Sequence, residues 1–332
     1  MLKSRFENFL SFIENKKILI TTHDLVDIDG LASCFALKSF LIQHLKNQTI
    51  LIYFPELSAK TKSFLKKFSD NFPKFDVSYE TSLDFTLVDV IILLDSNSLN
   101  QTGLTKKYDI FNLKNPIITI DHHHLNEKSL KNTLNLTLEE YSSTAEIILE
   151  LFECYNVQIK NSLKTLIAAA IITDSGFFKY GNNKTIHNIS KVIGEDINFQ
   201  SILSLLKSEI DMSQKIAKIK GIQRVELIRE GDYLIGVTNV SSFGGSIASM
   251  LLKTGFDIAI VFSKEINLYR INARAKKFIC LKTGLHLGKI FEAISEQYNG
   301  SGGGHDGAAA LSINIESGFN ITQLIQRIKD NL

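Results

Sequence analysis

The chain has 332 residues, of which 44% are hydrophobic and 22% charged, and its formal net charge is +2. This length accommodates two domains with separate cores, and the composition is that of an ordinary globular protein. No apolar run reaches the roughly 20 residues of a membrane span, and the small net charge does not indicate a duplex-binding protein.

The pattern of the N-terminal segment is more typical of an amphipathic helix than of a signal peptide. Cys34, Cys154 and Cys280 are too scattered for a disulfide framework or a zinc site, so we expect reduced thiols in a cytoplasmic protein.

The first part of the chain alternates short apolar runs, typical of buried parallel strands, with helical segments. We expect the strands and helices in this order: strand 18–22, helix 31–45, strands 49–54, 88–95 and 116–121, and helices 140–155 and 162–174. The pattern predicts an α/β domain with a parallel sheet over residues 1–190.

Residues 191–222 are predicted to form a helical linker region. A second, smaller α/β domain is then expected over residues 223–332. Its elements are predicted as a strand at 233–240, a helix at 245–254, strands at 256–262 and 269–275, a helix at 288–298, a glycine-rich loop, a strand at 308–314 and a helix at 320–332. The expected architecture is therefore two α/β domains with a cleft between them.

Acidic and imidazole side chains gather where the predicted strands end. The carboxyl ends of parallel strands share one edge of a sheet, where ligand crevices form. Asp174 ends an apolar run that is either a further strand or the end of a helix. The residues concerned are His23, Asp27, Asp29, Asp95, Asp121, His122, His123, His124 and Asp174.

Carboxylates that converge in one crevice raise each other's pKa, and a divalent cation removes that repulsion. A mixture of carboxylates and neutral imidazoles suits manganese or a related first-row metal better than calcium. One carboxylate can bridge two ions, as two-metal hydrolases require. Taken singly, Asp29 or Asp174 would be interpreted as a helix cap, Asp95 is more often a turn residue, and His23 is explained as a half-buried histidine. Three histidines after an aspartate at the end of a buried strand favour a ligand role.

Four motifs in order resemble those of the DHH superfamily of phosphoesterases: H-x-x-x-D-x-D-G at His23–Gly30, the strand-end Asp95, D-H-H at Asp121–His123, and the apolar approach to Asp174. The segment Gly300–Ala310 resembles the GGGH loop of the DHH-associated C-terminal domain. That loop is found in the branch of the nanoRNases (oligoribonucleases), the 3′-phosphoadenosine 5′-phosphate (pAp) phosphatases and the RecJ-like enzymes. The resemblance covers nearly the whole chain.

The resemblance implies a role for each matched residue of the first domain. His23, Asp27 and Asp95 would hold one metal ion, and Asp29, Asp95, His122 and Asp174 would hold the other, with Asp95 as the bridge. Asp121 would orient a histidine, and His123 would face the substrate phosphate, so Asp95 and His123 are the predicted catalytic residues. The side chains of His122 and His123 should point to opposite sides if the strand continues. His124 lies outside the motif and receives no role.

In the second domain, the glycines Gly302, Gly303 and Gly304 let backbone N–H groups approach a phosphate closely, and His305 adds a donor. A flexible hairpin turn is the alternative explanation of such a run. Arg274 resembles the family's substrate-binding arginine, and its planar fork suits a phosphate. Arg270 is expected to be exposed, and the role of Asn272 stays open.

The resemblance implies a manganese-dependent phosphodiesterase or phosphatase that acts on short oligoribonucleotides, and on pAp, through two metal ions and a bridging water. Mg²⁺ and Co²⁺ are alternatives to Mn²⁺. The competing functions are a soluble cyclic-dinucleotide or linear dinucleotide phosphodiesterase, a single-strand exonuclease, and, from another class, a non-catalytic nucleotide sensor. The expected partners are short RNA or small nucleotides, with no membrane, and a homodimer is left open.

Overall fold

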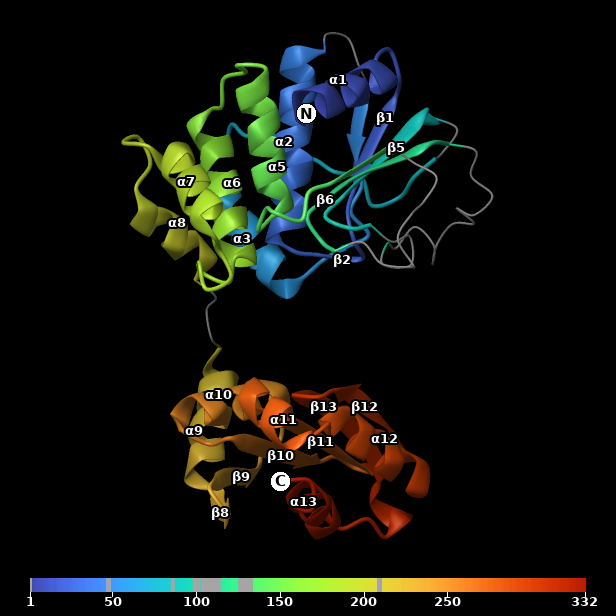
Figure 1. The fold of residues 1–332 in the computed structure, drawn as a ribbon, viewed down its shortest axis with the longest axis vertical. Helices are drawn as coiled ribbons and strands as arrows, with labels where there is room; N and C mark the ends of the chain where they lie inside the picture. Colours follow the sequence, from blue (N-terminus) through green and yellow to red (C-terminus); the bar gives the residue numbers. More distant parts are fainter. Residues whose placement is uncertain are drawn as a thin grey trace. The chain divides into compact units, whose positions relative to one another are not determined.

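The computed structural model of the protein describes residues 2–45, 49–84, 87–97, 102, 115–124, 134–207 and 211–332. The chain divides into two compact units, Met1–Ser208 (unit 1) and Glu209–Leu332 (unit 2) (Figure 1). The boundary between the units falls within the expected linker region 191–222. In that region, helix α8 (Phe199–Leu206) packs on helices of unit 1, and helix α9 (Met212–Gln223) packs on unit 2. The domain limits at 190 and 223 stay a prediction.

Unit 1 contains a parallel sheet with helices packed on it, and over the described residues the sheet has five strands in the order β3-β1-β5-β6-β7. Its strands are β1 (Ile18–Thr21), β3 (Ile50–Ile52), β5 (Val90–Leu94), β6 (Ile117–Asp121) and β7 (Leu134–Thr137), and β2 (Leu25–Val26) pairs separately with β4 (Glu56–Leu57). Besides α8, its helices are α1 (Leu2–Ile13), α2 (Ile28–His44), α3 (Ala59–Asn71), α5 (Thr144–Cys154), α6 (Asn161–Asp174) and α7 (Asn183–Ile193). The predicted parallel α/β fold of this part is confirmed.

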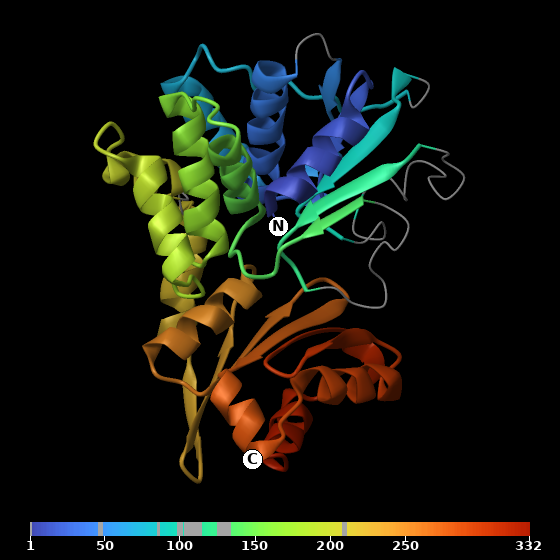
Figure 2. The same ribbon diagram turned by 45° about the horizontal axis from the view of Figure 1, so that its top comes forward.

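Both faces of the unit 1 sheet are buried. Alternate side chains of a strand point to opposite faces, so Ile18 and Ile20 of β1 join the large core under the helices. Leu19 and Ile91 join a smaller cluster with Tyr53 on the other face. This two-sided burial explains why the strands appear in the sequence as continuous apolar runs. Helices α2, α5 and α6 contact one another and lie side by side on the large-core face (Figures 1 and 2).

Helices α2 and α6 pack against each other in antiparallel orientation. The first turn of α2 carries Asp29, which lies near Asp174, the last residue of α6. The last turns of α2 share a pocket with Lys160 and Ser162 at the start of α6. The apolar run before Asp174 is therefore a helix, which brings this carboxylate to the sheet edge from the side.

Unit 2 contains a mixed sheet with helices on both faces, and its described strands follow the order β12-β13-β11-β10-β9-β8. Neighbours β9 and β10 are parallel, and the other neighbouring pairs are antiparallel. The strands are β8 (Glu226–Glu230), β9 (Tyr233–Asn239), β10 (Ile258–Lys264), β11 (Leu268–Ala275), β12 (Ser301–His305) and β13 (Ala308–Asn314). Helices α12 (Leu287–Gln297) and α13 (Ile321–Lys329) pack on one face, and α9 and α10 (Gly244–Thr254) pack on the other. Two shorter helices are α11 (Lys277–Thr283) and the 3₁₀ helix η4 (Ile315–Ser317). The prediction of a second α/β domain is confirmed.

The glycine-rich segment was wrongly predicted to be a loop. It forms β12, an edge strand that pairs with β13. Gly303 and Gly304 have φ values of +158° and +149°, which L side chains rarely adopt, and a Cβ on Gly304 would overlap the backbone of Ala308. A strand made of glycines has no apolar alternation, so the sequence pattern could not identify it.

No helix in the described part of the chain combines the length and the apolar character that a membrane span requires.

Candidate metal centre

The loop after β1 and the first turn of α2 supply three of the predicted ligands. Asp27 is the N-cap of α2, and its Oδ1 accepts a hydrogen bond from the backbone N–H of Gly30 at 3.0 Å. The buried Asp29 accepts hydrogen bonds from the backbone N–H groups of Thr144 (2.7 Å) and Ala145 (3.0 Å) at the start of α5. The N-terminus of α5 thus fixes the Asp29 carboxylate, because free helix N–H groups stabilise a negative charge.

Asp95 lies at the centre of the site. It follows β5 with a left-handed φ of +54°, and its side chain is buried. Its Oδ2 lies 3.5 Å from His23 Nε2, and its Oδ1 lies 3.4 Å from His122 Nε2. The hydroxyl of Thr144 also donates to Oδ1, at 3.2 Å. The two carboxylate oxygens of Asp95 therefore face two different groups of donors.

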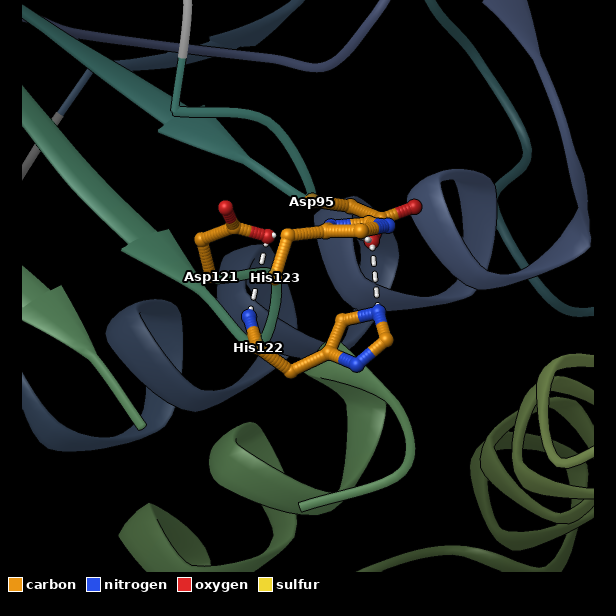
Figure 3. A group of neighbouring side chains, drawn as sticks. All are labelled: Asp95, Asp121, His122 and His123. Atoms are coloured by element: carbon orange, nitrogen blue, oxygen red, sulfur yellow. Dashed lines mark hydrogen bonds and ion pairs between the residues drawn. The ribbon is translucent and has the colours of Figure 1, made fainter. Parts of the chain in front are cut away.

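The end of β6 brings Asp121, His122 and His123 beside Asp95 (Figure 3). Asp121 Oδ1 accepts a hydrogen bond from the backbone N–H of His122 at 2.9 Å and lies 2.8 Å from His123 Nδ1. The expectation that His122 and His123 point to opposite sides is wrong. Their ring centroids are 4.2 Å apart, and both rings approach Asp95 Oδ1. Strand alternation does not apply because β6 ends at Asp121.

Asp174 completes the cluster from the end of α6. Its Oδ2 lies 3.1 Å from His122 Nε2. This nitrogen is buried and makes no hydrogen bond with any described residue, although two carboxylates lie close to it. A buried imidazole nitrogen that points at carboxylates without a hydrogen bond suits a metal ligand.

Two carboxylates of the cluster have raised pKa values, because they are buried and lie near other negative charges. Burial, together with the charges of Asp95 and Asp174, raises the pKa of Asp29 well above its ordinary range. Burial also raises the pKa of Asp174. Burial lowers the pKa of His23, but the carboxylates of Asp27 and Asp95 outweigh it and raise this pKa to about 10. The cluster therefore attracts positive charge, which a divalent cation supplies more fully than protons do.

Three overlapping groups of side chains have donor atoms close enough together for a cation. They are His23, Asp27 and Asp95; Asp29, His122 and Asp174; and Asp95, Asp121, His122 and His123. Carboxylate and imidazole donors in this mixture fit a divalent first-row metal. His124 belongs to none of these groups, and its Nδ1 lies 2.6 Å from Glu139 Oε2.

The predicted substrate residues of unit 2 are only partly brought together. Arg274, Asn272, Gly303 and Gly304 line a small pocket of about 270 Å³, beside Gly245 of α10. Gly302 faces the other way, because a Cβ there would meet Leu311 and the backbone of Phe291. His305 pairs with Ala308 and does not line the pocket. Arg270 is exposed, as expected, and its Nε lies 3.0 Å from Glu265.

Two features of the site were not predicted from the sequence. Thr144 contacts both Asp29 and Asp95, and its only sequence signal is the cap pattern Ser142-Ser143-Thr144 before α5. Directly after Asp174, Phe177 and Phe178 both adopt a left-handed φ (+57° and +68°). Such strain costs on the order of 1–3 kcal/mol per residue and occurs preferentially at functional sites.

Comparison with known proteins identifies the family. The model of the DHH family, N-terminal domain, matches residues 17–171, and that of the DHHA1 domain matches residues 244–332. An uncharacterized protein of Methanocaldococcus jannaschii is 30% identical over 96% of this chain and 94% of its own length. The chain therefore belongs to the DHH family and has the two-domain DHH–DHHA1 organisation. The predicted resemblance is confirmed, and with it the class of metal-dependent hydrolases acting on phosphoric esters.

Three further proteins share this similarity. The cyclic-di-AMP phosphodiesterase GdpP of Bacillus subtilis is 23% identical over 95% of this chain, which spans 47% of that protein's length. A probable manganese-dependent inorganic pyrophosphatase of Bacillus licheniformis is 28% identical over 60% of this chain and 62% of its own length. The crystal structure of an exopolyphosphatase-related protein from Bacteroides fragilis covers 99% of this chain and 96% of its own, with a TM-score of 0.68 and 18% identity. At that identity the likeness shows the fold alone.

Proposed function

We propose that this protein is a manganese-dependent phosphodiesterase of the nanoRNase type, which hydrolyses short oligoribonucleotides from dimers to pentamers and also removes phosphate from pAp. The observation that carries the proposal is the position of Asp95, whose two oxygens face two separate groups of ligands. That arrangement suits one carboxylate shared by two ions.

In this proposal, His23, Asp27 and Asp95 hold one ion, and Asp29, Asp95, His122 and Asp174 hold the other. Manganese accords with the mixed carboxylate and imidazole donors and with the similarity to the probable manganese-dependent inorganic pyrophosphatase. When bound, the metal pair lowers the pKa of a bridging water and neutralises the charge that develops on the phosphoryl group.

The other residues of the site position the reacting groups. Asp121 accepts a hydrogen bond from Nδ1 of His123 and raises the pKa of this ring, which favours the imidazolium form. In that form Nε2 also carries a proton and can donate it in a hydrogen bond to a phosphate oxygen. Thr144 and the N-terminus of α5 hold the carboxylates of Asp95 and Asp29 in place. Preorganised donors of this kind stabilise charge without reorganisation during the reaction.

We extend the proposal to unit 2, where Arg274 and the backbone of Gly303 and Gly304, which line one pocket, would hold a phosphate away from the reacting one. Gly302 and His305 lie outside that pocket and are left out of this contact. The exposed Arg274 and the open side of Gly303 support this, because nothing lies within 4 Å of a Cβ added at Gly303. A backbone without side chains lets a phosphate approach closely.

A product analysis tests the substrate class. End-labelled RNA dimers through pentamers and pAp are incubated with the protein and Mn²⁺, and the products are separated by size. We expect mononucleotides from every RNA length and AMP from pAp. Intact RNA in the presence of Mn²⁺ would contradict the proposal.

The second candidate is a cyclic-dinucleotide phosphodiesterase, which the similarity to GdpP over 95% of this chain favours. Cyclic di-AMP is added to the same assay to distinguish the two candidate functions. A cyclic-dinucleotide phosphodiesterase should open cyclic di-AMP faster than it cleaves the RNA dimer, and a nanoRNase should do the reverse. A non-catalytic nucleotide sensor would bind these molecules without manganese-dependent turnover. Cytoplasmic location and a homodimer stay predictions.

A further inference from the structure

A cavity of unit 1 is lined by none of the residues of the metal cluster. It has a volume of about 730 Å³ and opens between the last turns of α2, the segment that follows α3, and the start of α6. Small-molecule sites commonly have volumes of about 300–1,000 Å³. The function proposed above does not use this cavity.

The cavity has apolar and aromatic walls. Ile42 of α2 lines the cavity and is 56% exposed, so its side chain is accessible to a ligand. Phe72 and Phe75 are half-buried and also line it. Phe75 packs edge-to-face on Phe35, with a centroid distance of 6.0 Å, so the aromatic wall is fixed in position. Such a wall suits the face of a flat ring.

The rim of the cavity is basic. It contains Lys38, Lys74 and Lys160, against the single acidic residue Asp76. Asp76 is already paired with Lys38 at 3.2 Å. The ammonium groups of Lys74 and Lys160 have no ion pair or hydrogen bond with any residue in the part of the chain that the structure describes. Two unpaired cations therefore remain at the rim.

The start of α6 adds to this positive potential. Its N-cap, Lys160, makes no side-chain capping hydrogen bond, and Ser162 of the first turn lines the cavity. Uncapped N–H groups at the start of a helix attract anions. The flat apolar wall and the cationic rim together match a ligand with an aromatic ring at one end and a phosphate at the other.

We propose that this cavity is a second nucleotide site, which binds a nucleoside monophosphate with its base against Phe72, Phe75 and Ile42 and its phosphate at Lys74, Lys160 and the start of α6. A nucleoside monophosphate is the product of the function proposed above, and to that extent the inference rests on it.

The site is regulatory because it shares two helices with the metal cluster. Helix α2 carries Asp29 at one end and Ile42 near the other, and α6 carries Asp174 at its end and Lys160 at its start. At 1.5 Å per residue, Asp29 and Ile42 lie about 20 Å apart along α2. The bound nucleotide would contact both helices, so we expect its binding to favour one arrangement of α2 and α6 and thereby to change the positions of Asp29 and Asp174.

Fluorescence can report on this cavity alone, because the chain contains no tryptophan. The Ile42→Trp variant places a single indole in the wall, and Phe12→Trp, on α1, places one outside the cavity as a control. Both are titrated with AMP in the presence of a chelator, which keeps the metal cluster empty. We expect saturable quenching in Ile42→Trp only. Adenosine, which lacks the phosphate, should bind at least about tenfold more weakly.

Charge reversal tests the phosphate contacts. In the Ile42→Trp background, Lys74→Glu with Lys160→Glu should weaken AMP binding at least about tenfold. The matched control, Lys3→Glu with Lys66→Glu, changes the net charge equally but lies outside the cavity lining, and should leave binding unchanged. The proposal is overturned if AMP does not quench the fluorescence of Ile42→Trp, or if both double variants bind AMP equally. It is also overturned if decanoate, an anion with an aliphatic chain in place of the aromatic base, binds more tightly than AMP.

Turnover tests the coupling separately. AMP that competes with the substrate at the metal cluster should inhibit the wild type and the Lys74→Glu/Lys160→Glu variant equally. A difference in AMP inhibition between these two proteins therefore reports on AMP bound in the cavity. We expect the AMP concentration for half-inhibition of RNA-dimer cleavage to differ at least about threefold between these two proteins. Equal inhibition would overturn the regulatory role. The fluorescence titrations need no turnover, so failure of the proposed enzymatic function would leave the binding test intact.

Discussion

At the scale of the residue, the site depends on one aspartate in an unusual conformation. Asp95 is buried, has a φ of +54°, and lies between His23 and His122. Asn and Asp tolerate the left-handed region better than other residues with a side chain, because their short polar groups bond locally. Replacing Asp95 by Asn therefore removes the negative charge and keeps a residue that tolerates the left-handed conformation.

Asp95→Asn tests this residue most cleanly. We expect it to keep the fold, as measured by thermal unfolding, and to lose nearly all manganese-dependent turnover, to below about one per cent of wild type. Asp95→Ala should be equally inactive but less stable, because alanine is strained in the left-handed region. Retention of more than a few per cent of activity by Asp95→Asn in excess Mn²⁺ would exclude a bridging carboxylate.

The neighbours His122 and His123 should fail in different ways, although their rings lie together. The Nε2 atom of His122 lies 3.1 Å from Asp174, whereas Asp121 holds the half-exposed His123. We expect His122→Ala to weaken manganese binding in equilibrium dialysis. His123→Ala should keep the metal and lose turnover roughly 100- to 1,000-fold, as the loss of one preorganised donor does. Equal loss of metal in both variants would show that the two roles are wrongly divided.

At the scale of the element, buried parallel strands made the sheet of unit 1 predictable. Strands β1, β3, β5 and β6 are largely apolar runs, and the acidic and imidazole residues that form the cluster follow β1, β5 and β6. Contacts between residues distant in the sequence were not predictable. For example, the Asp29 carboxylate accepts hydrogen bonds from the backbone N–H groups of Thr144 and Ala145, which lie 115 and 116 residues further along the chain. Strand β7 was missed because its sequence, LNLT, alternates too briefly. Strand β12 was missed because glycine carries no periodic signal.

The glycines of β12 give a prediction at this scale. A side chain at Gly304 would overlap Ala308 at a φ of +149°, so Gly304→Ala should destabilise unit 2 by about 3 kcal/mol or more. Gly231, in the turn between β8 and β9, has a φ of +56° with nothing within 4 Å. Gly231→Ala should therefore cost only about 1–2 kcal/mol. Chemical denaturation measures both changes, and equal losses would contradict the close packing of β12 on β13.

At the scale of the whole molecule, the proposal assigns chemistry to unit 1 and recognition to unit 2. Arg274→Ala should lower kcat/KM on an RNA dinucleotide roughly 30- to 150-fold, because a charge-assisted phosphate contact contributes about 2–3 kcal/mol. Hydrolysis of bis-p-nitrophenyl phosphate, which has no second phosphate, should hardly change.

The control for Arg274 lies on the same strand. Arg270 is exposed and paired with Glu265, so Arg270→Ala should affect neither substrate. Equal loss on both substrates in Arg274→Ala would place Arg274 in the chemical step or in the fold. No loss on either substrate would make Arg274 an ordinary surface residue.

The most direct test of the account is the number of manganese ions that turnover requires. Metal-free protein is titrated with Mn²⁺, bound metal is counted by equilibrium dialysis, and cleavage of an end-labelled RNA dimer is measured on the same samples. We expect two ions per chain, and turnover that follows the second ion, because the proposal makes Asp95 a ligand shared by both. Full activity with a single ion bound, or cleavage that persists in excess chelator, would contradict the central claim.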